Sequence, residues 1–385
     1  MSLSNPHSSS SAPSSARVQG MKRSVQAAFD DPSDRGLGSG YQSKVRVVDR
    51  YKVIGFISSG TYGRVYKAVG RQGQPGEFAI KKFKPDKEGE QIQYTGISQS
   101  AVREMALCSE LSNLNVIRLV EIILEDKCIF MVFEYAEHDL LQIIHHHTQN
   151  PRCPIPASMV KSIMFQLLNG CQYLHANWVL HRDLKPANIM VTSAGQVKIG
   201  DLGLARLFHK PLHSLYGGDK VVVTIWYRAP ELLLGSRHYT PAIDMWAGEE
   251  AKMDSKKTVP FQRNQMQKIV DIMGMPTKER WPYLTSMHDN NNLASLGAEG
   301  YKLLAGLLEY DPERRLTAQQ ALQHPFFSTG DRVSNNCFEG LKTSYPQRRV
   351  SQDDNDIRTS SLPGTKRSGL PDDSLARPVK RVKEA

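Results

Sequence analysis

The sequence contains no uninterrupted apolar run of about 18 residues, the length at which a stretch is read as a membrane-spanning helix. Its opening segment, MSLSNPHSSSSAPSSARVQG, is rich in serine and lacks the apolar core that secretory signal peptides share. We therefore expect neither a membrane-spanning helix nor a secretory signal, and no membrane partner.

Cysteine is scarce and scattered. The chain has five cysteines, an odd number, and none belongs to a C-x-x-C pair. This pattern argues against a disulfide scaffold and against a zinc site, and it fits a reducing compartment. The five residues are Cys108, Cys128, Cys153, Cys171 and Cys337.

Basic residues are not concentrated in one region. The chain carries 49 Lys and Arg against 39 Asp and Glu, a net charge of +10, but residues 328–385 hold only 11 against 8. Spread charge of this kind does not indicate a nucleic-acid-binding groove, so we expect no sequence-specific nucleic-acid binding. One cluster, Pro378–Lys383 with Lys366–Arg367 before it, is typical of a nuclear localisation signal. A solvated tail is the alternative.

Both ends of the chain lack a hydrophobic period. Residues 1–45 are rich in serine, proline and glycine, and residues 328–385 are polar with scattered prolines. Such compositions bury too little apolar surface to fold, so we predict two disordered tails around a folded domain at residues 51–327.

The folded part begins β-rich and becomes helical. Short β-branched and aromatic runs separated by Gly and Pro predict strands over 51–58, 63–70 and 77–83 and a hairpin over 118–135. A helical stripe (Ala101, Met105, Leu107, Cys108 and Leu111) interrupts them, and a longer helix is predicted over 156–178, with Val160, Ile163, Leu167, Cys171 and Leu174 on one face. This order predicts an α+β fold with a ligand cleft between a β lobe and a helical lobe.

Two weak signals for phosphate binding lie in the β-rich part. Ser58–Val65 is a glycine-containing turn between strands, where glycines let the backbone approach phosphate oxygens. An ordinary hairpin turn is the alternative, and dinucleotide binding is disfavoured because a strand rather than a helix follows. Lys81 lies on the next strand, and Glu104 on the following helix is its candidate partner.

A third segment carries the most specific motifs of the sequence. His181–Asn188 reads HRDLKPAN, and Asp201–Gly203 and Ala229–Glu231 follow it as DLG and APE. In this order and spacing, the sequence resembles the eukaryotic protein kinases over residues 51–327. The resemblance implies the bilobal protein-kinase fold, with a small β-rich N-lobe at 51–135 and a mainly helical C-lobe at 136–327.

The resemblance also implies roles for individual residues, with ATP and Mg²⁺ as cofactors. Asp183 would accept or orient the substrate hydroxyl proton, and Lys185 would lie near the transferring phosphate. Asn188 and Asp201 would supply the hard oxygen ligands that Mg²⁺ prefers. The nucleotide would contact Ile57, Ser58, Ser59, Gly60, Thr61, Tyr62, Gly63, Arg64, Val65, Lys81 and Glu104, and adenine would meet the backbone of the hinge at Glu134, Tyr135 and Ala136, with Phe133 behind it.

Further strings resemble one branch of the kinases. Ser98–Glu104 resembles the cyclin-binding helix of cyclin-dependent kinases, in the variant found in the kinase of the Mediator complex. Ala136–Leu140 and residues 221–240, with Arg228, match that subfamily, and the C-terminal tail is similar to that of fungal members. The resemblance implies a cyclin C-type partner, other subunits of the Mediator kinase module and a nuclear location. It also implies a role as activator or repressor of transcription, acting on Ser/Thr-Pro sites in transcription factors and in the C-terminal repeat domain of RNA polymerase II.

One loop residue predicts how the enzyme is switched on. Asp219 stands where relatives carry an activating phosphothreonine that pairs with the arginine corresponding to Arg182. Aspartate brings one negative charge where a phosphate brings about −1.5 to −2. We therefore predict activity that depends on cyclin and not on phosphorylation of this loop. A solvated loop acid is the alternative.

Three departures from the kinase pattern stand out. Ser58 replaces the first glycine of the phosphate loop, and Leu202 replaces the usual phenylalanine. After Asp244, where kinases continue a long apolar helix, the chain becomes charged over Glu249–Lys257, and Arg315, the expected partner of Glu231, follows early. We expect the central helix of the C-lobe to be truncated, in the protein or through an incomplete gene transcript.

Two other functions remain open at this point. A truncated C-lobe suits a catalytically impaired scaffold that still binds cyclin. A mitogen-activated kinase is suggested faintly by Ser214–Tyr216, but the cyclin-type helix disfavours it. The run His145–His147 could bind a metal, although the polar side of a helix explains it better.

Overall fold

The structure is a computed structural model that describes residues 45–59, 63–71, 73–83, 99–125, 128–149, 154–208, 225–234, 236, 240–246, 261–274 and 297–351. The predicted N-terminal tail up to residue 44 and the basic cluster near the C-terminus lie outside these residues. Within the described part, no helix has the length and apolar character needed to cross a membrane.

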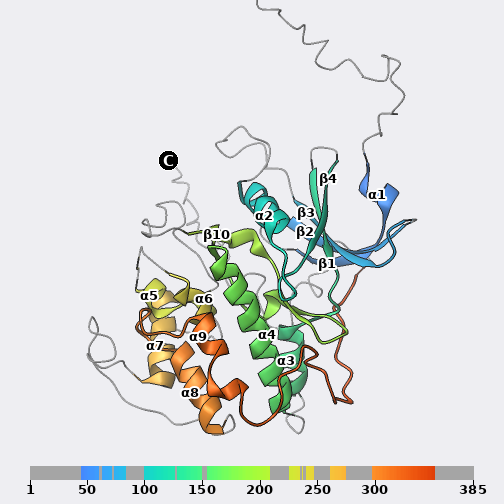
Figure 1. Cartoon of the computed structure of the whole chain (residues 1–385). Helices are drawn as coiled ribbons and strands as arrows, with labels where there is room; N and C mark the ends of the chain where they lie inside the picture. Colours follow the sequence, from blue (N-terminus) through green and yellow to red (C-terminus); the bar gives the residue numbers. More distant parts are fainter. Residues whose placement is uncertain are drawn as a thin grey trace, which may run out of the picture. The chain divides into compact units, whose positions relative to one another are not determined.

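The β-rich half forms one antiparallel sheet. Its five strands lie in the order β1-β2-β3-β5-β4 (Figure 1). They are β1 (Tyr51–Ser59), β2 (Gly63–Gly70), β3 (Glu77–Phe83), β4 (Leu119–Glu125) and β5 (Cys128–Glu134), after a short helix α1 (Val47–Arg50). Gly63 is required where β2 approaches β3, because a Cβ atom there would lie 2.4 Å from the Lys82 carbonyl oxygen. The predicted strands and the predicted hairpin are confirmed.

Helix α2 (Gln99–Glu110) lies beside this sheet (Figure 1). Ala101, Leu107 and Cys108 are buried in a common core with Phe83 of β3 and Met131 of β5. The apolar stripe predicted from the sequence is therefore the face of α2 that anchors it. This packing also fixes where Glu104 of the same helix points.

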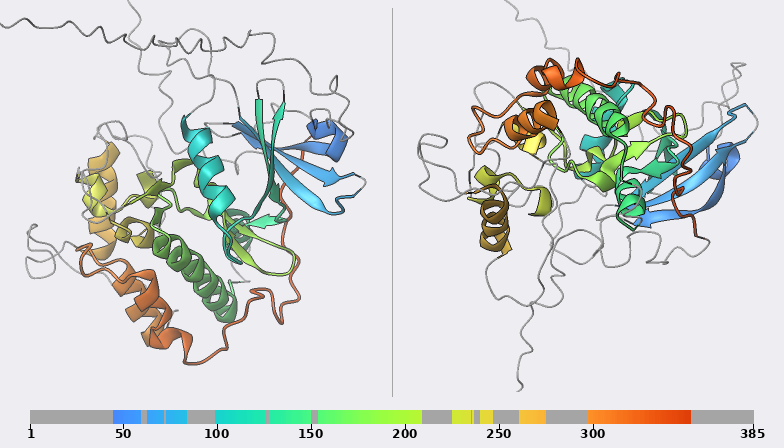
Figure 2. Two further views of the ribbon diagram at one scale, coloured as in Figure 1. Left: turned by 45° about the horizontal axis from the view of Figure 1, so that its top comes forward. Right: turned by 90° about the horizontal axis from the view of Figure 1, so that it is seen from below.

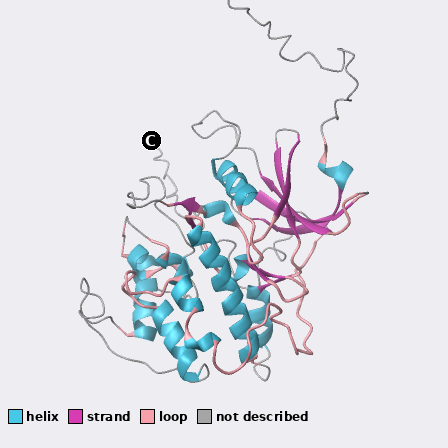
Figure 3. Ribbon diagram, in the orientation of Figure 1, coloured by secondary structure: helices cyan, strands magenta, loops and turns pink. Residues whose placement is uncertain are grey.

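The second half is mainly helical (Figure 3). Its helices are α3 (Leu140–Gln149), α4 (Ala157–Ala176), α5 (Pro230–Leu233), α6 (Ala242–Trp246), α7 (Phe261–Met273), α8 (Gly297–Leu307) and α9 (Ala318–Leu322). Short strands join them: β6 (His138–Asp139), β8 (Ile189–Val191) and β9 (Val197–Ile199) form one sheet, and β7 (Val179–Leu180) pairs with β10 (Arg206–Leu207). The β-rich lobe followed by a helical lobe is the bilobal arrangement expected from the sequence.

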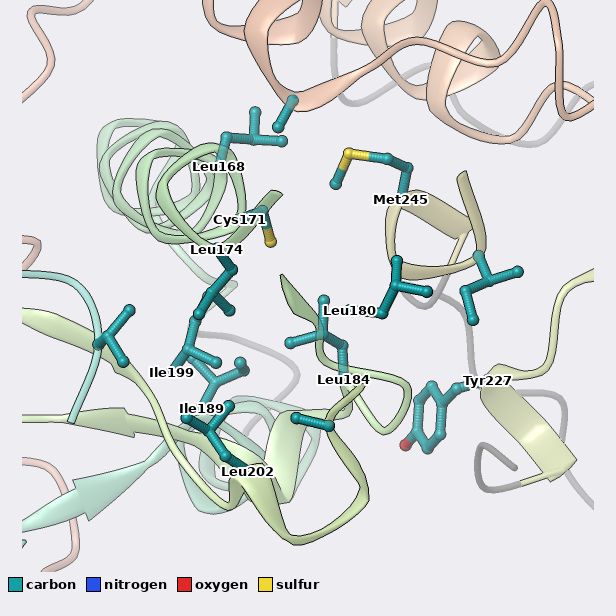
Figure 4. Packing of buried hydrophobic residues seen from close by; sticks show 14 of the residues in the cluster. Leu168, Cys171, Leu174, Leu180, Leu184, Ile189, Ile199, Leu202, Tyr227 and Met245 are labelled. Atoms are coloured by element: carbon teal, nitrogen blue, oxygen red, sulfur yellow. The ribbon is translucent and has the colours of Figure 1, made fainter. Parts of the chain in front are cut away.

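Helix α4 is the centre of the helical core. Leu168, Cys171 and Leu174 project from it towards the residues around the β8–β9 hairpin and towards Met245 of α6 (Figure 4). Ile163 and Cys171 are buried as predicted, but Val160 and Leu167 are only half-buried. The difference arises because α4 is also covered on another side, where its polar residues Lys161, Ser162 and Gln166 are buried.

A glycine in the middle of α4 marks its closest approach to the neighbouring strands. A Cβ atom at Gly170 would lie 2.7 Å from Ile199 Cδ1 and 2.8 Å from the Asn115 carbonyl oxygen. Gly170→Ala is therefore expected to destabilise the protein by about 1–3 kcal/mol through overpacking, even though alanine is the better helix former. Urea unfolding of the two proteins measures the difference; an alanine variant as stable as the wild type would contradict the packing described.

Helix α6 begins where the sequence predicts the central helix of the C-lobe, and the predicted truncation falls on residues 247–260, outside the described part. In the described part, α6 covers only five residues, Ala242–Trp246, all buried. Its first residue accepts a hydrogen bond of 2.8 Å from Arg315, and Trp246 packs against Tyr310 with ring centroids 5.9 Å apart. The charged segment Glu249–Lys257 lies outside the described residues.

The prediction of disorder from residue 328 onward is wrong for residues 328–351. This segment has no helix or strand of its own, yet Cys337 is 3% exposed and Tyr345 is 6% exposed. It is held by backbone hydrogen bonds to the rest of the chain, which an irregular segment can form without any hydrophobic period. Residues 352–385 lie outside the described part.

The same segment explains the histidine run on α3. His147 is buried, and its Nε2 lies 3.1 Å from the Tyr345 hydroxyl. Among the described residues, no group of three or more His, Cys, Asp or Glu is placed to hold a metal ion. The run contributes a contact to the C-terminal segment.

Candidate active site

One cluster of charges joins the sheet, helix α2 and the DLG segment. Lys81 Nζ on β3 lies 2.7 Å from both carboxylate oxygens of Glu104 on α2 and 2.9 Å from Asp201 Oδ1. Glu104 is buried, whereas the Asp201 side chain is 47% exposed. The lysine therefore connects a buried acid to one that remains accessible to a ligand.

The protonation states in this cluster follow from the geometry. Burial alone would lower the pKa of Lys81, but the negative charges of Asp201 and Glu104 outweigh burial and raise it above its ordinary value. The positive charge of Lys81 lowers the pKa of Asp201 to about 2. Lys81 is thus a cation and Asp201 an anion at neutral pH, as a phosphate- and metal-binding site requires.

A second cluster forms around Asp183 in the loop between β7 and β8. Lys185 Nζ lies 2.7 Å from Asp183 Oδ2, and Asn188 Nδ2 lies 3.2 Å from the same oxygen and 2.9 Å from the Asp183 carbonyl oxygen. Because the amide nitrogen of Asn188 is used in these bonds, its amide oxygen is the atom available as a metal ligand.

The two clusters are linked through the β8–β9 hairpin. Gly200 N donates a 2.9 Å hydrogen bond to the Asn188 carbonyl oxygen, and His181 Nε2 lies 2.9 Å from the Gly200 carbonyl oxygen. The charge of Lys185 is close enough to contribute to the lowered pKa of Asp201. The structure thus brings together the predicted catalytic residues Asp183 and Lys185 and the predicted metal ligands Asn188 and Asp201.

The predicted hinge is held in place by two contacts of the Glu134 side chain. The Glu134 carboxylate accepts a 2.8 Å hydrogen bond from Arg118 N and forms an ion pair of 2.9 Å with Lys198. Ala136 is buried. Because the side chain of Glu134 is engaged in this way, a nucleotide would meet the hinge through its backbone, as the sequence-based prediction states.

The predicted phosphate loop is described only in part. Ser58 pairs with Val65 and Ser59 with Arg64 across the β1–β2 hairpin, and Val65 is the neighbour of Lys81 on β3. Ile57 is buried at a register shift of β1. Gly60, Thr61 and Tyr62 lie outside the described residues. The strands therefore place Val65, the last residue of the predicted loop segment, beside Lys81 of β3.

Comparison with known proteins decides the family. The protein kinase domain family matches residues 51–327, which include both charge clusters and the hinge. The chain belongs to the protein kinase family. It is 70% identical to serine/threonine-protein kinase SSN3 of Chaetomium globosum over 97% of this chain and 88% of that protein. It is 68% identical to SSN3 of Gibberella moniliformis, over 92% and 95% of the two chains, and 66% identical to ssn3 of Aspergillus niger, over 90% and 94%.

These findings make the chain an ATP-dependent serine/threonine protein kinase. The residues present fit the cofactors that such an enzyme uses. Asp201 and Asn188 offer the carboxylate and amide oxygens that suit Mg²⁺, which supplies charge neutralisation for the phosphates when bound. Lys81 offers a fixed cation for phosphate oxygens, and Asp183 an acceptor for the proton of the incoming hydroxyl.

The kinase is shorter than its relatives. Its alignment with the Chaetomium protein runs over 450 positions, although the kinase has 385 residues, so the relative carries residues within the aligned part that the kinase lacks. Helix α6 contains Asp244, whose role the sequence did not reveal.

Asp244 positions the catalytic loop of the kinase. Its carboxylate accepts hydrogen bonds from the backbone N–H groups of His181 (3.0 Å) and Arg182 (2.9 Å) and lies 2.9 Å from His175 Nε2. Arg182 has a positive φ of 66°, a strained value for a non-glycine residue, which this bond helps to hold. The available sequence signal was a lone acid among the apolar residues of AIDMW.

Removal of the Asp244 carboxylate should destabilise the conformation of the catalytic loop. Asp244→Ala would leave two buried N–H donors without an acceptor, each costing about 1–3 kcal/mol, so both stability and kcat should fall. The exposed acid Asp271 on α7 serves as a control, since Asp271→Ala should change neither. Thermal unfolding and a peptide phosphorylation assay measure the two effects. Equal behaviour of the two variants would refute the positioning role.

The DLG segment is closely packed, with its leucine in the core and its glycine against the charge cluster. Leu202 is 1% exposed in the hydrophobic core, so it fills the place of the usual phenylalanine. A Cβ atom at Gly203 would lie 3.2 Å from Glu104 Oε2 and 3.3 Å from Asp201 Oδ1. Glycine at this position therefore keeps the charge cluster uncrowded, a function that the sequence analysis did not assign.

The APE segment, Ala229–Glu231, is anchored by a buried ion pair. Arg315 binds Glu231 through two parallel hydrogen bonds of 2.8 and 3.0 Å, which confirms the predicted pair. Arg228 is buried. Arg182 is also buried, and its Nε donates a 2.7 Å hydrogen bond to the Leu204 carbonyl oxygen. Asp219 and Ser214–Tyr216 lie outside the described residues.

Proposed function

We propose that this kinase is the cyclin C-dependent kinase of a Mediator kinase module. It would transfer the γ-phosphate of ATP to Ser/Thr-Pro sites in the C-terminal repeat domain of RNA polymerase II and in transcription factors. Nuclear residence, through the basic cluster Pro378–Lys383, and a role in activating or repressing transcription complete the proposal. The proposal is supported by the sequence strings that resemble this subfamily and by the high identity to fungal serine/threonine kinases.

The position of α2 carries the proposal. This helix holds Glu104 on Lys81, the arrangement in which a kinase can bind the phosphates productively. On the same helix, Val102 is 49% exposed and Ala101 is buried. The helix thus has one apolar face against the sheet and an exposed apolar residue available to a cyclin, which would stabilise this position of α2.

Purified full-length kinase, with and without a cyclin C-type subunit, tests the proposal. We expect transfer to a Ser-Pro peptide that requires the cyclin, is far weaker for the matching Ser-Ala peptide and survives phosphatase treatment because Asp219 replaces the activating phosphate. Equal transfer to both peptides would contradict Ser/Thr-Pro specificity. Cyclin binding without transfer would favour the scaffold function.

The nuclear location has a separate test. A fluorescent fusion of the full chain should accumulate in the nucleus, and the double variant Lys380→Ala, Arg381→Ala should distribute through the cell. Lys342→Ala, a change outside the cluster, is the control. Nuclear accumulation of the cluster variant equal to that of the wild type would contradict the assignment of the signal.

A further inference from the structure

A segment that joins both lobes is the most extended feature that the kinase chemistry does not explain. We call residues 328–351 the C-terminal strap. In Figures 1 and 2 its red trace leaves the helical part beyond α9 and runs up to the five-stranded sheet. Its contacts fall into three groups, which lie on the C-lobe, at the hinge and on the N-lobe.

The first group anchors the strap on the C-lobe. The ammonium group of Lys161, a buried residue of α4, donates hydrogen bonds to the carbonyl oxygens of Thr329 and Asp331. Further along, Ser334 N binds Ser162 Oγ at 3.1 Å, and Cys337 N binds the Gly195 carbonyl oxygen at 3.0 Å. A buried lysine directed at backbone carbonyls shows that α4 is shaped to receive the strap.

The second group of contacts lies near the hinge. Tyr345 stacks on Phe338 with ring centroids 5.0 Å apart, and its hydroxyl lies 3.1 Å from His147 Nε2. Beyond it, Arg348 N donates a 2.7 Å hydrogen bond to the Glu137 carbonyl oxygen. The strap therefore contacts the chain immediately after the predicted hinge residues Glu134–Ala136.

The third group ties the strap to the N-lobe. Ser351 and Phe56 exchange two backbone hydrogen bonds, of 2.8 Å from Ser351 N and 2.7 Å from Phe56 N. Phe56 is 1% exposed on β1 and directly precedes Ile57 and Ser58, two of the predicted nucleotide-binding residues. The strap ends, within the described part, at the strand that leads into the phosphate loop.

We propose that the C-terminal strap is a positioning element for ATP, which fixes β1 of the N-lobe relative to the hinge and the C-lobe. A segment fastened to both lobes on the hinge side limits how far they separate, and the paired strand β1 holds the start of the phosphate loop in place. Positioning of phosphates is the main catalytic task of a kinase, so the strap acts through β1 on nucleotide affinity. The inference rests on the predicted nucleotide site.

A proline substitution removes one bond without touching the core. Ser351→Pro deletes the N–H that Phe56 accepts, and loss of one such hydrogen bond should weaken Mg-ATP binding by about threefold to tenfold. Arg349→Ala, an exposed neighbour in the strap, is the matched control and should bind ATP as the wild type does. Calorimetric titration of the full-length proteins with Mg-ATP gives the dissociation constants.

Two shortened chains extend the test. A chain ending at Ser344 loses the hinge and N-lobe contacts, whereas a chain ending at Gln352 keeps them and loses only residues beyond the strap. We expect the first to bind ATP more weakly than Ser351→Pro and to exchange the amide hydrogens of residues 51–59 faster, with an unchanged KM for a peptide substrate. The second should match the wild type in all three measurements.

The outcomes distinguish a failure of the proposed role of the strap from a failure of the predicted nucleotide site. Wild-type ATP affinity in both Ser351→Pro and the chain ending at Ser344 would overturn the role of the strap while leaving the nucleotide site intact. Equal weakening by Arg349→Ala, or unchanged amide exchange over residues 51–59 in the shorter chain, would also overturn it. Absence of ATP binding by the wild type would overturn the nucleotide site and the strap together.

Discussion

Asp183→Asn is expected to lower kcat by about 10²- to 10⁴-fold, the usual contribution of a general base in proton transfer. Asparagine has nearly the same shape, so the packing of the catalytic loop should survive. It cannot take up the proton of the substrate hydroxyl, and it replaces the carboxylate that now binds Lys185 at 2.7 Å. The KM for ATP should change little, because Lys81 and Asp201 are untouched.

Steady-state phosphorylation of a Ser-Pro peptide measures this effect. Asp271→Asn makes the same chemical change at an exposed position on α7 and should retain wild-type kcat. A kcat for Asp183→Asn within twofold of the control would mean that Asp183 is not at the reacting centre, despite its contacts with Lys185 and Asn188.

Arg315→Leu should give the largest loss of stability, about 3–5 kcal/mol, the range found when one partner of a buried ion pair is removed. The Arg315 side chain is fully buried and the Glu231 side chain is 7% exposed. The arginine also donates hydrogen bonds to the carbonyl oxygens of Ala242, Glu309 and Tyr310. Its removal would leave a buried carboxylate and three acceptors without their donor.

A double-mutant cycle separates the pair from the rest. Arg315→Leu combined with Glu231→Leu should be less destabilised than the sum of the single variants, because no buried charge is left unpaired. Arg314→Leu is the matched control, since the Arg314 side chain is 56% exposed and its pair with Asp311 is long at 3.7 Å; about 1 kcal/mol or less is expected. Additive single effects in urea unfolding would contradict a coupled pair.

Arg315 also contacts helix α6. By binding the Ala242 carbonyl oxygen and packing its guanidinium group 5.0 Å from the Trp246 ring, it holds both ends of α6 in place. Asp244 in the middle of α6 then reaches the catalytic loop. The portion of the central helix that contacts the active site is therefore present, which argues for catalytic competence over a purely scaffolding role.

Much of the site could be predicted because its residues belong to recognisable local sequence patterns. Lys81 and Glu104 lie 23 positions apart on a strand and a helix whose periods are clear, and the structure joins them at 2.7 Å. The pairing of Glu231 with Arg315 followed from family motifs in the same way. For Lys81 and Glu104, a regular strand and an amphipathic helix also indicated the direction of the side chains, whereas for Glu231 and Arg315 the motifs alone indicated the pair.

The C-terminal strap could not be predicted for the opposite reason. Its contacts use backbone groups of irregular chain, which leave no hydrophobic period and no residue-type signature. Tyr345 and His147 are 198 positions apart, and neither type indicates the other. One signal was available: Lys161 stands in a helix whose neighbours Met159 and Ile163 are buried, and a lysine at such a position needs acceptors from elsewhere.

The most direct measurement of the central claim is transfer of labelled γ-phosphate from ATP to a protein substrate by the full-length kinase, assayed together with the proposed cyclin C-type subunit. The wild type and Asp201→Asn are compared over a range of Mg²⁺ concentrations. The account predicts transfer by the wild type that rises with Mg²⁺ and is abolished by a chelator. It also predicts that Asp201→Asn falls to the background of Asp183→Asn at every Mg²⁺ concentration. Transfer by Asp201→Asn at the wild-type rate and with the same Mg²⁺ dependence would contradict it.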